Sequence, residues 1–376
     1  MSLRQFVELP EVWRIELMVP DFCTYFDIGY LPRAVALFES LQANSPGSRL
    51  FAVCMDSESY TTLVQMNLPG LFPVRREEFE DGDIELSSLA ASRTVVEYYF
   101  TCTSSVVLYV LKRNPEISLL FYVDADFWFF SSIDEMIEDM GAGSVYIVEH
   151  RFPDSQKHLE MYGRFNVGIL GFRNDPAAKN CLLKWRHDCI EWCFDRLEGD
   201  RFADQKYLDQ WPGQCAGLTI AKHPGVNVAP WNKANYIFSR TSEGTRVNGR
   251  RLICFHFQGL RIHRFGLIEP QSIDYGSAIS AECLEFVYKP YLRALNRISR
   301  TLNRKSTARR YGKEPIVREI WRTRRHAPYL LQFSSCIFRL FRWRVFPGML
   351  WLQGRRLLAG LRETRAPVVA KGKNEL

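Results

Sequence analysis

Short apolar segments alternate with helical patterns from about residue 21 onward, and this alternation limits the chain to few architectures. Apolar runs typical of buried strands occupy residues 22–26, 50–55, 117–123, 144–148 and 165–172. Helical patterns lie between them, at residues 31–41, at 92–111 and from Asp175-Pro176 onward; an Asp followed by a Pro is a favoured helix start. Strands that alternate with helices predict an α/β fold with a mostly parallel mixed sheet and helices on both faces.

Two acids follow the clearest of these strands. Asp124 and Asp126 come directly after residues 117–123, and ligands of parallel sheets bind beyond the carboxyl ends of the strands. Unpaired carboxylates beside a buried sheet are costly, and a divalent cation would neutralise them. The structural alternative is a turn whose acids cap a helix or pair with Arg. A second triplet, Asp81-Gly82-Asp83, lies in a polar stretch that is typical of a solvated loop.

Three further segments place polar residues at the ends of apolar runs. His256 lies near the end of the run at 252–257, and Gly259 follows three positions later, where glycine permits a close backbone approach to a phosphate. Asn166 lies at the start of residues 165–172, and Asp204 and Gln205 open a short amphipathic helix. Each has a structural alternative: a hydrogen-bonded histidine, an amide paired with backbone, or an N-cap for Asp204.

The order of these segments resembles the family 8 glycosyltransferases and related bacterial sugar transferases of the GT-A fold. The resemblance covers roughly residues 21–265. The matching segments, in chain order, are Phe26-Asp27-Ile28-Gly29-Tyr30 for the first nucleotide-binding strand end, Tyr122-Val123-Asp124-Ala125-Asp126 for "YLDxD", Phe165-Asn166-Val167-Gly168-Ile169-Leu170 for "FNAGVLL", Asp204-Gln205-Lys206-Tyr207-Leu208 for "DQD", and His256-Phe257-Gln258-Gly259 for "HxxG".

The chain departs from the family pattern at three places. Lys206 stands where a second acid is expected after Gln205, and the Lys-Pro-Trp that follows "HxxG" is absent, so Arg261 and Arg264 are the nearby candidate phosphate partners. The helix before the two acids carries Thr103-Ser104-Ser105 where a base is often found, and Arg93 is the candidate substitute.

The resemblance implies a metal-dependent, retaining sugar transfer from a UDP-sugar to a glycan or lipid-linked acceptor, as in polysaccharide or lipopolysaccharide biosynthesis. Asp124, Asp126 and His256 would hold the metal, and this ligand set suits Mn²⁺ or Mg²⁺. Asp204, Gln205 and Asn166 are the implied catalytic residues. The implied donor-binding residues are Asp27, Tyr30, Arg93, Asp124, Gly259 and Arg261.

Charge is distributed unevenly along the chain. Residues 291–376 hold 21 of the 49 Lys and Arg but 4 of the 42 Asp and Glu, a net charge of +17, whereas the first 290 residues carry a net charge of −10. We expect an N-terminal extension at residues 1–20, a catalytic domain at 21–268 and a basic, aromatic-rich helical region at 269–376. Two interpretations of the last region stay open: a contact with an anionic membrane surface, or a helical pair packed on the catalytic domain.

Composition also favours a location. No run of 18 uncharged apolar residues occurs, so no membrane-spanning helix is expected, and residues 1–20 lack a secretory apolar segment. The ten cysteines include no CxxC pair. A reducing cytoplasm is the simplest compartment, with the inner membrane face as the place where the basic region would act.

Other function classes make distinct predictions. A nucleotidyltransferase would share the sheet and the acids but usually needs a Gly-rich basic loop after the first strand, which residues 27–32 do not form. A nucleic-acid-binding protein would carry bases throughout the fold, whereas the body is acidic, so no nucleic-acid partner is expected. A non-enzymatic sugar-binding protein would keep the sites without turnover.

Overall fold

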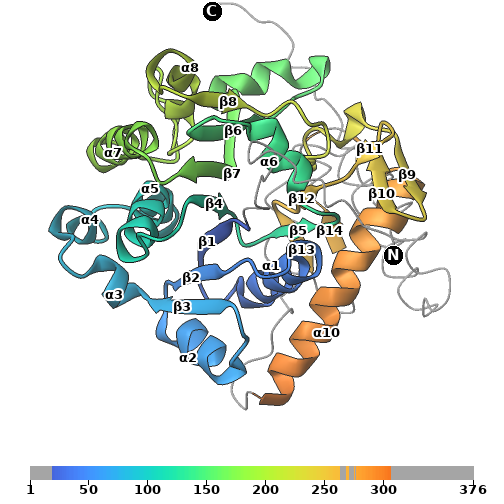
Figure 1. The fold of residues 1–376 in the computed structure, drawn as a ribbon, viewed down its shortest axis with the longest axis horizontal. Coiled ribbons are helices and arrows are strands. Elements are labelled where there is room, and N and C mark those ends of the chain that lie inside the picture. Colours follow the sequence, from blue (N-terminus) through green and yellow to red (C-terminus); the bar gives the residue numbers. More distant parts are fainter. Residues whose placement is uncertain (1–18, 263–267, 271–274, 276, 306–376) are drawn as a thin grey trace, which may run out of the picture. The chain divides into compact units, whose positions relative to one another are not determined.

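The computed structural model describes residues 19–262, 268–270, 275 and 277–305. A seven-stranded sheet in the order β3-β2-β1-β4-β7-β6-β8 forms its centre (Figure 1). The pairs β3-β2, β2-β1, β1-β4 and β6-β8 are parallel, and β7 is antiparallel to both of its neighbours. The predicted fold class, an α/β protein with a mostly parallel mixed sheet, is confirmed.

The first half of the sheet is built from consecutive strand-helix units. The elements are β1 (Asp21–Phe26), α1 (Leu31–Asn44), β2 (Leu50–Cys54), α2 (Ser57–Met66), β3 (Leu71–Arg75), α3 (Arg76–Glu80), α4 (Ile84–Leu89) and α5 (Val95–Arg113). Asp56 caps α2 by accepting from the Ser59 amide, and Thr94 and Glu97 form a capping box at the start of α5. Such caps satisfy amides that have no partner within the helix.

The second half of the sheet places the candidate residues. Its elements are β4 (Leu119–Val123), β5 (Phe127–Phe129), α6 (Asp134–Met140), β6 (Val145–Glu149), the 3₁₀ helix η2 (Asp154–Tyr162), β7 (Phe165–Arg173), α7 (Pro176–Glu191), η3 (Lys206–Gln210), α8 (Trp211–Gln214) and β8 (Leu218–Ile220). The predicted start of α7 is confirmed, since Asp175 caps it by accepting from the Ala178 amide.

The two faces of the sheet are covered by different helices. Helices α5 and α7 pack on one face, and α1 lies on the other (Figure 1). Side-chain alternation along β1 matches this division, because Cys23 belongs to the core beneath α5 and α7, whereas Phe22 packs against Phe129 of β5. Successive strand residues point to opposite faces, so both faces of the central strands are buried.

The segments after β8 add small sheets and a C-terminal helix. They are η4 (Lys233–Asn235), β9 (Phe238–Thr241), β10 (Gly244–Val247), β11 (Arg250–Arg251), β12 (Cys254–His256), β13 (Leu260–Ile262), β14 (Ile268–Pro270), α9 (Ala281–Cys283), the π-helical turn η6 (Leu284–Tyr288) and α10 (Lys289–Lys305). α10 lies along α1 and buries Tyr291, Leu295, Ile298 and Leu302. Arg264, residues 1–18 of the expected N-terminal extension and residues 306–376 of the expected basic region lie outside the described residues.

Two structural observations concern the cytoplasmic location that the sequence suggests: the state of the cysteines and the character of the helices. A disulfide joins Cys181 of α7 to Cys215, a pairing that the sequence did not signal, and seven other described cysteines are free and buried. Among the described helices, none combines the length and the apolar character that crossing a bilayer requires. The cytoplasmic location stays a prediction.

Candidate metal and nucleotide site

Three side chains from distant parts of the sequence converge at one edge of the sheet. Asp124 and Asp126 follow β4, and the chain then forms β5, which pairs antiparallel with β12 so that Phe127 lies opposite His256. This register brings the imidazole to the acids: His256 Nε2 lies 3.1 Å from Asp126 Oδ1 and 3.5 Å from Asp124 Oδ2. The imidazole also stacks on Phe127 at 4.3 Å between ring centroids.

The electrostatics of this cluster favour an ionised Asp126. Burial opposes its ionisation, but the charge and hydrogen bond of His256 outweigh burial and lower the pKa of Asp126. Burial likewise opposes protonation of His256, yet Asp126 raises the pKa of His256 above its usual value. Asp124 accepts a 2.6 Å hydrogen bond from the Tyr122 hydroxyl, and burial raises the pKa of Asp124 despite the nearby imidazole.

The donor atoms of this cluster fit a divalent cation. One oxygen from each acid and one imidazole nitrogen lie within 4.8 Å of one another. With metal–ligand bonds of about 2.1 Å, adjacent ligands of an octahedral ion lie roughly 3 Å apart, close to the separations from His256 Nε2. Nε2 is the ring nitrogen that faces the acids, and the other, Nδ1, is buried without a hydrogen-bond partner among the described residues.

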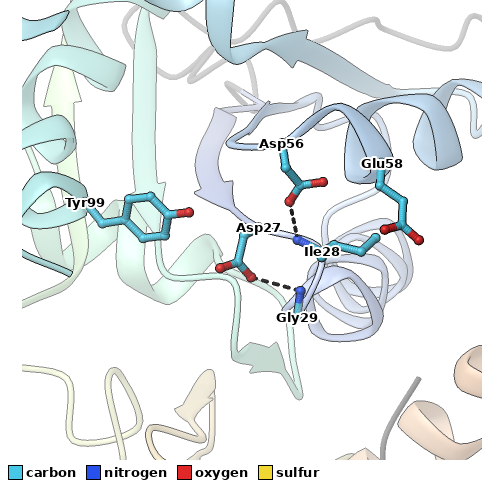
Figure 2. Close-up of a pocket in the computed structure, with 6 residues that line it drawn as sticks. All are labelled: Asp27, Ile28, Gly29, Asp56, Glu58 and Tyr99. Atoms are coloured by element: carbon cyan, nitrogen blue, oxygen red, sulfur yellow. Dashed lines mark hydrogen bonds between the residues drawn. The ribbon is translucent and has the colours of Figure 1, made fainter. Parts of the chain in front are cut away.

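A cavity of about 460 Å³ opens at the carboxyl end of β1 (Figure 2). It is lined by Asp27, Ile28, Gly29, Asp56, Glu58 and Tyr99. Two carboxylates shape its rim, because Asp27 accepts from the Gly29 amide at 2.9 Å and Asp56 accepts from the Ile28 amide at 2.6 Å. A Cβ on Gly29 would lie 3.0 Å from the Asp27 carboxylate, so glycine permits this tight turn. Asp56 lies just after β2, as Asp27 lies just after β1. A polar residue at the end of a strand is therefore the sequence signal that could have identified Asp56.

Tyr30 and Arg33 follow the turn that lines this cavity and interact electrostatically with the acid cluster. Tyr30 is 42 % exposed, and the charge of Asp126, together with burial, raises the pKa of Tyr30 to about 12. The Arg33 guanidinium lies 4.7 Å from the centre of the Tyr30 ring and donates to the Leu260 carbonyl at 2.7 Å. The sequence reasoning did not single out Arg33.

Asp204 is a buried acid close to the cluster, with 4 % of its surface exposed. Thr103 of α5 donates to its Oδ2 at 2.8 Å, and the Tyr25 hydroxyl lies 3.1 Å from the same Thr103 oxygen. Burial and then the charge of Asp124 raise the pKa of Asp204 to about 7, although the Thr103 bond opposes the shift. The N-cap of η3 is Gln205, which makes no side-chain capping bond, so Asp204 does not play the capping role that the sequence left open.

The backbone before Asp204 adopts an unusual conformation. Ala203 has φ +46°, in a region that non-glycine residues seldom occupy, and Trp185 Nε1 donates to the Asp204 carbonyl at 2.9 Å. Gln205 is half-buried, and its amide donates to the Tyr162 carbonyl at 3.0 Å. Lys206, which departs from the family pattern, pairs with Asp209 at 2.8 Å.

Asn166 lies in a buried polar network behind His256. Its Oδ1 accepts from the Gly168 amide at 3.1 Å and from Asn227 at 3.2 Å, and its amide nitrogen lies 3.2 Å from His150 Nε2. A Cβ on Gly168 would lie 2.7 Å from both Asn166 Oδ1 and the His256 ring. Only glycine leaves room for this contact. His150 directly follows β6, so the strand-end signal could have found it, whereas Asn227 carried no such signal in the sequence.

The remaining predicted donor-binding residues lie in different surroundings. Arg93 is buried, and its guanidinium donates to Thr101 and to the carbonyls of Cys189 and Ile190 in α7. Gly259 has φ +65° in the turn between β12 and β13, and Arg261 lies 3.9 Å from Glu269. Gly259 is thus three positions after His256 in the chain. The described hydrogen bonds of Arg93, by contrast, join the turn before α5 to α7.

The fold and site thus define an α/β protein with an acid-acid-histidine cluster next to a cavity at the first strand end. The chain belongs to the same family as the uncharacterized protein YfnF of Bacillus subtilis, to which it is 32 % identical over 256 residues, covering 65 % of this chain and 83 % of YfnF. The uncharacterized protein YfnD of the same organism is 27 % identical over 282 residues, covering 73 % of this chain and 88 % of YfnD.

Solved structures of sugar transferases are also similar to this chain. A galactosyltransferase LgtC in complex with donor and acceptor sugar analogues matches with a TM-score of 0.46 at 14 % identity, covering 80 % of this chain and 99 % of LgtC. Mouse xyloside xylosyltransferase 1 matches with a TM-score of 0.42 at 12 % identity, covering 64 % of this chain and 98 % of that enzyme. No model of a protein family matches the sequence.

Proposed function

We propose that the protein is a divalent-metal-dependent glycosyltransferase that moves a sugar from a nucleotide-diphosphate donor to a glycan or lipid-linked acceptor. The observation that carries the proposal is the convergence of Asp124, Asp126 and His256 within 4.8 Å of one another. The motifs that resemble family 8 supply the expected roles: the donor is a UDP-sugar, the metal is Mn²⁺ or Mg²⁺, and the anomeric configuration is retained.

The cavity at the end of β1 is the proposed nucleoside subsite. Its volume of about 460 Å³ falls within the range of small-molecule sites. The Tyr99 ring offers an aromatic surface for a base, and the carboxylates of Asp27 and Asp56 can accept hydrogen bonds from a base edge or from ribose hydroxyls. Because these acids would repel phosphate, the diphosphate would extend from the cavity past Tyr30 toward the metal cluster.

The chemistry of the transfer follows from the same arrangement. A cation held by Asp124, Asp126 and His256 would supply Lewis-acid stabilisation of the charge on the leaving diphosphate. Asp124 and Asp126 would hold that charge in place, and Asp204 and Gln205 would orient the donor sugar and the acceptor hydroxyl, since positioning contributes much of the rate acceleration in a transfer of this kind. Asn166 would act from behind His256, because its contacts fix the strand that packs against the imidazole.

A thermal-shift panel tests this proposal. We expect one nucleoside diphosphate, and its sugar conjugates, to raise the melting temperature only when Mn²⁺ is present. At a ligand concentration of about 100 times Kd the stabilisation amounts to about 2.7 kcal/mol, which corresponds to several degrees. Asp126→Asn and His256→Ala should abolish the metal-dependent shift. Equal shifts with and without metal, or none with any nucleotide, would contradict the proposal.

The same panel, together with an assay of donor hydrolysis, separates the alternatives. A nucleotidyltransferase would bind nucleoside triphosphates and sugar phosphates, whereas a glycosyltransferase would bind diphosphates and release the sugar slowly to water. A sugar-binding protein without turnover would show the metal-dependent shift but no hydrolysis of the donor.

A further inference from the structure

Arg33 occupies a position between the cavity and the acid-histidine cluster. It lies in the first turn of α1, immediately after Pro32, and is half-buried. Its Nη2 donates to the carbonyl of Leu260 at 2.7 Å, and its Nη1 lies 3.5 Å from the carbonyl of Gly29. The guanidinium thus bridges the turn that follows β1 and the turn that follows β12, the two turns that flank the proposed path of the donor.

The positive charge of Arg33 acts on the residues around the cluster. It contributes to the lowered pKa of Asp126, and it opposes the rise in the pKa of Tyr30 and of Tyr291. Its hydrogen-bond partners among the described residues are both backbone carbonyls. By contrast, Arg261, one of the two bases that the sequence suggested for this region, lies near Glu269.

The charge balance of the metal cluster shows what the guanidinium of Arg33 could do. Asp124 and Asp126 together cancel the charge of a divalent metal once His256 binds as a neutral imidazole. A diphosphate brings further negative charge, which the metal and the two acids alone would leave uncompensated. A guanidinium has five N–H donors and matches the geometry of phosphate oxygens, and the two carbonyls occupy only part of that set.

We propose that Arg33 binds the donor diphosphate directly and supplies the cation that completes the charge balance of the metal cluster. This inference rests on the proposed function and names the residue that would recognise the diphosphate. A structural alternative is that Arg33 only ties α1 to β13 and offsets the charge of Asp126.

Calorimetric binding measurements separate these roles. The ligands are UDP, UMP and inorganic pyrophosphate, each with saturating Mn²⁺, together with Mn²⁺ alone. We expect Arg33→Gln to weaken UDP and pyrophosphate binding by about 10- to 100-fold, as for a lost charge-assisted hydrogen bond, and to weaken UMP binding much less. Arg33→Lys should recover part of the affinity, since it keeps the charge but not the planar fork.

Arg297→Gln provides the matched control. Arg297 of α10 pairs with Glu39 of α1, so this variant removes another arginine that ties α1 to a neighbouring element, and it should leave all four affinities unchanged. Equal losses for UDP and UMP in Arg33→Gln, or a parallel loss of Mn²⁺ affinity, would show a structural role and overturn the inference. Unchanged UDP and pyrophosphate affinity would also overturn it.

The same measurements distinguish an error in the proposed function from an error in the role of Arg33. If the wild-type protein binds neither UDP nor pyrophosphate in the presence of Mn²⁺, the metal-diphosphate site itself is wrong and the role of Arg33 falls with it. If the wild-type protein binds both and Arg33→Gln binds them equally well, only the role of Arg33 is refuted.

Discussion

Asp204 carries the largest electrostatic cost among the proposed catalytic residues, because its carboxyl group is buried near a second acid. Thr103 holds this carboxyl in either protonation state: the hydroxyl can donate to the carboxylate, or accept from the carboxylic acid and donate to the Phe100 carbonyl at 3.2 Å. A hydroxyl can serve both states because it has one donor and two acceptor sites. Thr103 therefore positions Asp204 although it lies on a different element.

The raised pKa of Asp204 predicts a pH dependence of stability. Its pKa is about 7 in the folded state and about 3.9 in the unfolded chain, so the folded protein binds the extra proton between these values and loses stability as pH rises through them. We expect wild type to lose about 2–3 kcal/mol more unfolding free energy than Asp204→Asn between pH 5 and pH 8 without metal. Urea unfolding of both proteins at the two pH values measures this difference.

Thr103 provides an internal comparison for that measurement. Thr103→Ser keeps the hydroxyl and should follow the wild-type profile. Ser105→Ala removes a buried hydroxyl that has no partner in the described part of the chain and controls for the loss of a polar group in α5. Parallel pH profiles for wild type and Asp204→Asn would show that Asp204 ionises normally in the folded state.

At the scale of elements, Arg93 joins two helices that pack on the same face of the sheet. Its guanidinium comes from the turn before α5 and donates to carbonyls at the end of α7, which otherwise lack helical partners. Neighbouring helices α4 and α7 are joined differently, by Arg186 with Asp83 at 2.6 Å and Glu85 at 3.0 Å. Asp83 also caps α4 by accepting from the Leu86 amide, so this acid of the second Asp-x-Asp triplet has a structural role.

Replacing these arginines separates a structural role of Arg93 from the donor-binding role that the sequence suggests. Arg93→Met leaves buried acceptors without donors, and we expect it to lower the unfolding free energy by about 2–4 kcal/mol. The more exposed Arg186→Met should cost about 1 kcal/mol or less. Urea unfolding measures both. If Arg93→Met instead keeps its stability and loses nucleotide affinity, Arg93 contacts the donor.

At the scale of the whole molecule, the basic C-terminal part of the chain begins within the described fold. α10 is integrated into the fold, because its apolar side chains pack along α1, while Arg293, Arg297 and Arg300 on its other side are exposed. Residues 306–376 carry 16 Lys and Arg and 4 Asp and Glu. A truncation that tests the membrane interpretation should therefore begin after α10, since a cut at residue 270 would expose the face of α1 that α10 covers.

We expect a chain ending at residue 305 to keep the melting temperature of the full protein and to lose binding to vesicles that contain anionic phospholipid. Each Lys or Arg near such a surface contributes on the order of 1 kcal/mol, and the effect should weaken as salt is raised. Co-sedimentation with anionic and with neutral vesicles measures the loss. Equal binding by both chains would favour the interpretation in which the C-terminal region packs on the catalytic domain.

The sequence alone determined the elements and the residues at their ends. Apolar runs and caps such as Asp175-Pro176 act over a few neighbouring residues, so β1, β2, β4, β7 and the start of α7 were predicted close to their observed bounds. The acids of the cluster were found for the same reason, since Asp124 and Asp126 directly follow a buried strand. His256 was a weaker prediction, because one histidine after an apolar run is common.

Only the tertiary structure decided which side chains meet. The pairing of β5 with β12 brings His256 to Asp126 across 130 residues. The packing of α5 against β1 brings Tyr25 to Thr103, whose hydroxyl donates to Asp204. The sequence carries no local signal for such contacts, because they depend on strand register and helix placement rather than on neighbouring residues. Arg33 was missed for this reason: its helix was predicted, but the direction in which its guanidinium extends is set by the carbonyls of two turns that the fold brings together.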